Sequence, residues 1–190
     1  MVKGWTDYVT GKQLIYYRNI FRRQAYINID YLIDLYKSDK CYLDLKKLKK
    51  TKPELYCTVT DYETKEPVIL DLKKNDVFQV MRATCAVPLL YHKKILIDGK
   101  RYYNGSLSIN KVFNKIIDSL LANDYDKIII IVNRQGLVKS KHPRISIIEP
   151  SRLPLRGHLD TDLRRVSKTI EQGRQKAKEF IKKYGLIASR

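Results

Sequence analysis

The apolar run at 128–132 constrains the fold more than any other feature of the sequence. It reads Ile-Ile-Ile-Ile-Val, with no polar residue at any position. A strand with one covered face alternates apolar and polar residues, whereas a strand of a parallel sheet is covered on both faces and is apolar throughout. The run therefore predicts a buried strand in a parallel sheet. Because few segments before Leu55 have the composition of further parallel strands, we expect that sheet to be incomplete.

Two hairpins are predicted upstream of this strand. Their β-prone segments lie at 55–59, 68–70, 94–97 and 101–103. In the second hairpin the strands flank Asp98-Gly99, a dipeptide that favours the positive φ angles of a two-residue turn. Asn104-Gly105 follows and is a second turn signal.

Helical spacing of apolar residues appears in four segments. The first expected helix ends near Lys37, and the second runs from an N-cap at Asn75 or Asp76 toward Pro88. The third includes 112–120, and the last begins at Thr161 or Asp162 and reaches about Tyr184. Pro88 must end the second helix, because proline lacks the N–H donor and clashes with the preceding turn. A further short strand is expected at 145–148. Strands that alternate with helices are typical of the α/β class, so we predict an α/β domain over 1–150 with a mostly parallel sheet, and a helical extension over 151–190 that packs on it.

The net charge indicates partners but does not choose among them. The chain has 190 residues and a formal net charge of +18. Such a charge attracts the phosphates of nucleic acid or an anionic membrane face, and a general abundance of lysine is the third interpretation. One local cluster runs from Lys46 to Lys52. With no apolar stretch of about 18 residues and no secretory signal pattern, we expect a cytoplasmic protein, peripheral at the membrane if the charge is functional.

Cysteine and histidine spacing predicts neither a metal site nor a cofactor. The residues are Cys41, Cys57, Cys85, His92, His142 and His158, with no C-x-x-C pair and no metal-ligand spacing. We expect reduced thiols that pack in the structure, and no bound metal or cofactor.

Four segments carry sequence motifs in a fixed order. They are CTVTDYETKEP at 57–67, RATCAVP at 82–88, IDGKRYYNGSL at 97–107 and YDKIIII at 125–131. In order and spacing these segments resemble the C-terminal portion of the patatin-like phospholipases. The resemblance continues into Pro150-Ser151 and the helix around Gly173, and covers nearly the whole chain from about Trp5 onward.

The resemblance implies a three-layer α/β fold and lipid acyl hydrolysis by a Ser-Asp dyad. In that family the serine lies in a G-x-S-x-G elbow, and an upstream glycine-rich loop supplies the oxyanion hole. Neither motif occurs in this sequence. A serine hydroxyl reacts only with a base and oxyanion donors beside it, one donor often contributing about 3 to 4 kcal/mol. We therefore expect a truncated or degenerate homologue, without its N-terminal nucleophile half and inactive by itself.

Asn104 stands where the family places its catalytic aspartate, and Gly105 and Ser106 follow as its Asp-Gly-Gly or Asp-Gly-Ala motif would. An amide cannot accept a proton as a carboxylate does, so a general base is not expected here. Ser106 is the nearest conceivable substitute nucleophile, although a turn residue is the favoured interpretation at that position. The other motif residues of the candidate site are Asp98, Gly99 and Pro88.

Three functions remain open from the sequence. The first is the incomplete patatin-like hydrolase. The second is a basic, tyrosine-rich binding module for anionic membrane lipid or nucleic acid. The third is a subunit that completes a split hydrolase. The partners expected are membrane phospholipid, a separately encoded N-terminal hydrolase piece or a second copy of the chain, with nucleic acid less favoured.

Overall fold

A computed structural model describes the chain in several ranges. These are residues 5–9, 15–16, 26–105, 109–133, 135–150, 160 and 162–184. Internal contacts divide the chain into two compact units, Lys3–Lys115 and Ile116–Arg190, and each unit is described by itself. The division falls within helix α5 (Ile109–Ala122). The sequence instead predicted a boundary near residue 150. The segment that follows this predicted boundary, 151–159, lies outside the described residues.

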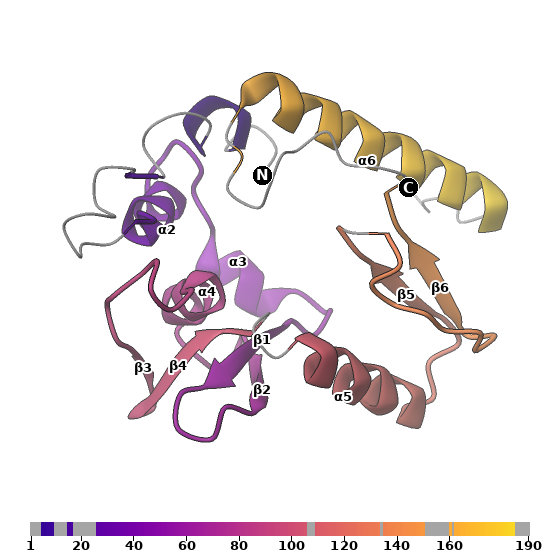
Figure 1. The fold of residues 1–190 in the computed structure, drawn as a ribbon, viewed down its shortest axis with the longest axis horizontal. Helices are drawn as coiled ribbons and strands as arrows, with labels where there is room; N and C mark the ends of the chain where they lie inside the picture. The colour runs from indigo at the N-terminus through magenta and orange to yellow at the C-terminus, as the bar shows by residue number, and fades with distance from the viewer. Residues whose placement is uncertain are drawn as a thin grey trace. The chain divides into compact units, whose positions relative to one another are not determined.

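The first unit is built on a four-stranded antiparallel sheet with the strand order β2-β1-β4-β3 (Figure 1). Its strands are β1 (Tyr56–Asp61), β2 (Pro67–Asp71), β3 (Ile95–Ile97) and β4 (Lys100–Asn104). Both predicted hairpins are confirmed, since β1 pairs with β2 and β3 pairs with β4. The pairing of β1 with β4 joins the two hairpins into one sheet.

The turn between β3 and β4 has the predicted form. Asp98 and Gly99 have φ angles of 49° and 77°. Ile97 pairs with Lys100, so only these two residues connect the strands. Positive φ at both central residues is what a type I′ turn requires.

Two helices cover the sheet in successive layers. Helix α4 (Val77–Cys85) contacts β1, β3 and β4, and helix α2 (Ile29–Lys37) contacts α4. The Asp76 carboxylate caps α4 by accepting hydrogen bonds from the first free N–H groups of the helix, and the helix ends before Pro88 as predicted. The side chains buried between these layers include Ile29, Ile33, Val59, Val80 and Ala83.

The expectation of a mostly parallel sheet is wrong. Hairpin connections of a few residues can join only antiparallel neighbours, because a parallel pair needs a crossover of a dozen residues or more. Among the described residues, parallel pairing occurs between β5 (Ile128–Ile131) and β6 (Ile145–Ile148). The fold is therefore mixed α/β, with a four-stranded antiparallel sheet, a two-stranded parallel sheet and a C-terminal helix, α6 (Leu163–Tyr184).

Polar contacts connect helices α5 and α6 to the small sheet of the second unit. The Arg144 guanidinium, just before β6, donates hydrogen bonds to the carbonyl groups of Leu121, Asn123 and Tyr125 at 2.8 to 3.2 Å, which satisfies the end of α5. Helix α6 contacts β6. A hydrogen bond with the Ser146 hydroxyl lowers the pKa of Tyr184, in the last turn of α6.

Strand β5 is covered on one face only. Ile128 and Val132 are buried, whereas Ile129 and Ile131 are 43% and 74% exposed. The expectation that both faces are covered is therefore wrong for the described residues. Parallel strands are normally covered on both faces, so packing within the described chain does not explain isoleucine at the two exposed positions.

Two short elements have no counterpart among the predicted ones. They are a π-helix at Trp5–Val9 and helix α3 (Leu45–Lys50), whose N-cap is Asp44. Five or six residues are too few to show a helical period in the sequence. In the part of the chain that the structure describes, no helix is both long and apolar enough to cross a membrane.

Candidate functional site

Asn104 is the last residue of β4 and is fixed from two sides. Its N–H donates a hydrogen bond of 2.9 Å to the carbonyl of Ala86, the C-cap residue of α4. Its carbonyl accepts one of 3.0 Å from the hydroxyl of Thr60, a buried residue of β1. In the ladder Asn104 pairs with Val59. Backbone contacts with β1 and α4 therefore hold this position, whatever its side chain.

Gly105 follows and approaches β1 too closely for any other residue. A Cβ atom at this position would lie 2.4 Å from the carbonyl oxygen of Thr58 and 2.8 Å from its carbonyl carbon. Of the described glycines, positive φ belongs to Gly99 and Gly136, and not to Gly105. The close approach to β1, rather than a hairpin turn, therefore explains why glycine follows Asn104.

Three of the four motif segments meet at Asn104. The segment 57–67 contains β1, the segment 97–107 contains β4, and the segment 82–88 contributes Ala86 at the end of α4. Figure 1 shows these three elements beside one another. The fourth segment, 125–131, contains β5 and belongs to the other unit.

The remaining motif residues are not brought to Asn104. Asp98 and Gly99 form the turn at the opposite end of β4, roughly 15 to 20 Å away along the strand. Pro88 is exposed and follows the C-cap of α4 by two residues. Ser106 lies outside the described residues. Of the predicted site residues that the structure describes, Asn104 and Gly105 therefore lie together at one fixed position. Asp98 and Gly99 belong to a turn elsewhere, and Pro88 follows the end of α4.

Chemically, this position offers hydrogen bonding but no base. An amide side chain donates and accepts hydrogen bonds, but it does not take up a proton at neutral pH. Within the ranges described, no three His, Cys, Asp or Glu side chains gather closely enough to hold a metal ion. The chain thus holds position 104 firmly through its backbone, and the amide side chain there cannot act as a general base.

Comparison with models of known protein families, with curated proteins and with solved structures finds no match. The functional interpretation therefore depends on the motif segments and on the geometry at Asn104.

A polar cluster around Asp30 supports the same region. The Asp30 carboxylate, in the first turn of α2, accepts hydrogen bonds from Arg82 Nε at 3.1 Å, from the Tyr91 hydroxyl at 3.1 and 3.2 Å, and from Lys93 Nζ at 2.8 Å. The cluster ties α2 to α4 and to the chain after Pro88, on either side of Ala86. Asp30 is 52 to 63 positions away from its three partners in sequence, so no local pattern could have predicted the cluster.

The environment shifts the pKa of two groups in this cluster. Burial by itself would raise the pKa of Asp30, but hydrogen bonds from Lys93 and Tyr91 and the charges of Lys93 and Arg82 outweigh burial, so the pKa is lowered. Desolvation, together with the Asp30 charge, raises the pKa of Tyr91 to about 12. Asp30 is therefore an anion, and Tyr91 a hydrogen-bond donor, throughout the neutral range.

Asp30→Asn is expected to lower the free energy of unfolding at pH 7 by about 1 kcal/mol, a value reduced for the solvent that reaches Asp30. Because the pKa of Asp30 is lowered on folding, its carboxylate stabilises the fold above the unfolded pKa of about 3.9, and this contribution is lost as the pH falls through the folded value. Urea titrations at pH 7 and pH 3 should show the difference between the two proteins shrinking at low pH.

The matched control for this prediction is Asp34→Asn, an exposed change on the same helix. It should alter stability by less than about 0.5 kcal/mol. An equal loss in both variants, or a loss at Asp30 that does not depend on pH, would contradict the role assigned to the cluster.

Proposed function

We propose that this chain is the C-terminal part of a patatin-like lipid acyl hydrolase and is catalytically incomplete by itself. The observation that carries the proposal is the meeting of three motif segments at Asn104-Gly105. The steric requirement for glycine at 105 supports it, because the family's motif also has glycine after its aspartate. A partial three-layer fold, which the missing half would complete, forms part of this proposal.

The proposed incompleteness has a direct chemical basis. In a Ser-Asp dyad the aspartate takes the serine proton while the serine oxygen attacks the ester carbonyl, and oxyanion donors stabilise the charge that develops. This sequence has no serine in a G-x-S-x-G elbow. Asn104 cannot take the proton. Either defect alone would prevent turnover by this route.

The purified chain is therefore expected to hydrolyse short acyl esters no faster than a heat-denatured sample, and to remain unlabelled by a fluorophosphonate probe. Release of nitrophenol and intact mass measure these two outcomes. Ser106→Ala is the matched variant and should be indistinguishable from the parent chain. Turnover that a fluorophosphonate abolishes would overturn the proposed incompleteness.

The second proposed function, a subunit that completes a split hydrolase, is favoured by the exposed face of β5. Ile129 and Ile131 alternate along the strand and so share one face. Ile131 pairs with Ile148 of β6, which extends this face. A two-stranded sheet is marginally stable in water without further cover. We infer that a nucleophile-bearing partner, or a second copy of the chain, covers it.

Self-association at high protein concentration is the expected consequence. Ile129→Thr/Ile131→Thr should weaken it by roughly 100-fold or more, since burying one isoleucine is worth about 2 kcal/mol. Threonine keeps the β-branched shape of the strand residues. Light scattering over a concentration series measures the effect, and Ile69→Thr/Leu96→Thr, exposed on the other sheet, is the control. A parent chain that stays monomeric and melts cooperatively would count against this function.

A further inference from the structure

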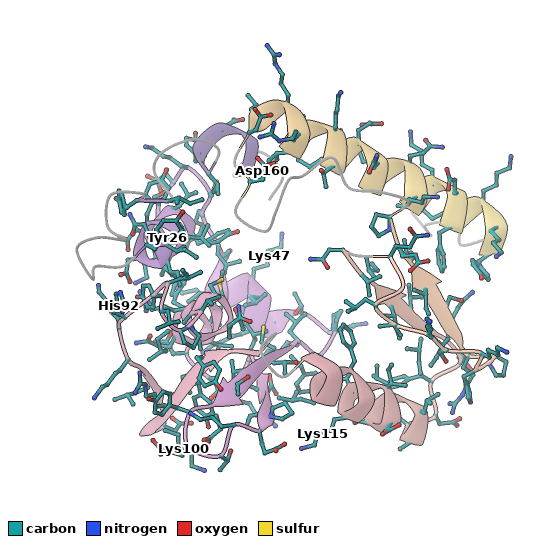
Figure 2. All side chains as sticks on the ribbon, in the orientation of Figure 1. Tyr26, Lys47, His92, Lys100, Lys115 and Asp160 are labelled. Atoms are coloured by element: carbon teal, nitrogen blue, oxygen red, sulfur yellow. The ribbon has the colours of Figure 1, made fainter. Side chains whose placement is uncertain are left out.

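Seven lysines lie at one end of the four-stranded sheet. This lysine patch consists of Lys46, Lys47, Lys49, Lys50, Lys52, Lys73 and Lys74. Leu45 and Leu48 are half-buried and attach α3 to the unit, which leaves the lysines of α3 exposed. Figure 2 shows Lys47 extending from α3 away from the sheet.

The two parts of the lysine patch are held together by the fold. Lys73, in the turn after β2, donates its Nζ hydrogen bond to the carbonyl of Thr51, just after α3. Beside this contact, the N–H of Leu72 donates to the carbonyl of Leu55 at 2.8 Å. These two contacts hold the segment after β2 beside the segment that follows α3, so the lysines of both segments belong to the same region of the unit.

The lysine patch and Asn104 lie at the same end of the sheet. The patch precedes β1, which begins at Tyr56, and follows β2, whose last residue Asp71 pairs with Tyr56. Strand β4 runs antiparallel to β1, so its end approaches the beginning of β1, with Asn104 beside Val59. Gly105 then lies against Thr58. The sheet topology thus places the basic surface on the side toward which Asn104-Gly105 runs.

Little of this positive charge is neutralised nearby. Asp44 caps α3 and Asp71 pairs with Lys74 at 3.8 Å, while Glu54 is the third carboxylate in the surrounding sequence. Among the described residues, Lys74 is the member of the patch with an ion pair. Tyr42 and Tyr56 flank the patch and are 65% and 55% exposed. Their rings have the apolar body and polar tip that suit a membrane–water interface.

We propose that the lysine patch docks this chain on an anionic membrane surface, with the Asn104 end of the sheet toward the lipid. Lysine is a compact point charge that suits the diffuse charge of lipid headgroups. Bidentate recognition of phosphates and base edges favours arginine, which the patch lacks, so a membrane fits better than nucleic acid. The orientation of Asn104 rests on the proposed function, whereas the binding does not.

Co-sedimentation of the full chain with phospholipid vesicles tests the proposal. The chain should bind vesicles of one part phosphatidylserine to two parts phosphatidylcholine, and should not bind phosphatidylcholine alone. Binding should weaken as salt shortens the screening length from about 8 Å at physiological ionic strength to about 3 Å at 1 M. Equal binding to both vesicles, or duplex DNA that displaces the chain from anionic vesicles at equal phosphate concentration, overturns it.

Matched variants separate the patch from the net charge. Lys46→Gln/Lys47→Gln/Lys49→Gln/Lys50→Gln should weaken binding about fivefold per lysine, or roughly 600-fold in all. Lys94→Gln/Lys100→Gln/Lys139→Gln/Lys141→Gln removes four exposed lysines outside the patch and should weaken binding less than about tenfold. Equal losses in the two variants would show that net charge, and not the patch, attracts the membrane.

A smaller variant keeps the test valid if the fourfold change alters the fold. Lys49→Gln/Lys50→Gln should weaken binding by roughly 25-fold, with an unchanged melting curve. A loss below about threefold overturns the proposal. Since these readouts measure binding alone, a failure of the hydrolase proposal would leave them unchanged, and a failure of docking would leave the chemistry at Asn104 unaffected.

Discussion

Gly105→Ala is expected to lower the free energy of unfolding of the first unit by about 3 kcal/mol or more. The new Cβ would lie 2.4 Å from the carbonyl oxygen of Thr58. Strand β1 cannot withdraw, because Thr58 pairs with Ile69 of β2 on one side while Val59 pairs with Asn104 on the other. The strain must therefore displace the end of β4 or break its pairing with β1.

Urea unfolding followed by circular dichroism measures this loss, and Gly99→Ala is its control. Gly99 has no atom within 4 Å of a new Cβ, and only its positive φ of 77° opposes alanine. That conformation costs an L-residue about 1 to 2 kcal/mol. If Gly105→Ala were no more destabilising than Gly99→Ala, the close packing of β4 on β1 at Asn104 would be wrong.

The sequence predicted the elements whose signals are local. Helix α4 is an example, since Asp76 caps one end and Pro88 limits the other, and both act within one or two turns of the helix. The Asp98-Gly99 turn is another, because the dipeptide itself selects the positive φ angles that connect β3 to β4.

Features that depend on distant residues were not predicted. The pairing of β1 with β4 and the contacts of Asp30 join segments with no shared local pattern. Gly105 shows the same limit, since a glycine needed for close approach looks in sequence like a glycine needed for a turn. The apolar run of β5 wrongly predicts a mostly parallel sheet, because such a run describes one strand and not the pairing of the others.

Asn104→Asp is expected to restore catalysis when the chain is joined to the nucleophile-bearing half of a patatin-like hydrolase. General-base catalysis contributes about 10² to 10⁴-fold, so the aspartate form should exceed the asparagine form by that factor. The change is nearly isosteric. The backbone bonds to Ala86 and Thr60 hold the position in either form, so the new carboxylate should occupy the place of the amide.

Asp98→Asn in the same joined chain is the control for a general effect of charge. Asp98 lies in the turn at the far end of β4 and belongs to the same motif segment. Its replacement should leave the rate unchanged within about twofold, a difference of less than about 0.5 kcal/mol in the activation free energy. If Asp98→Asn lowered the rate of the joined Asn104→Asp chain as much as restoring asparagine at 104 does, position 104 would have no special role.

The most direct test of the central claim is the initial rate of acyl-ester hydrolysis in four samples. These are the chain alone and the chain joined to a nucleophile-bearing half, each with asparagine or aspartate at 104. The joined chain with Asn104→Asp is expected to be the only one with turnover well above the uncatalysed rate. Hydrolysis by the Asn104→Asp chain alone would contradict the claim that this chain lacks a nucleophile. Equal rates in the two joined forms would contradict the assignment of the catalytic position to Asn104.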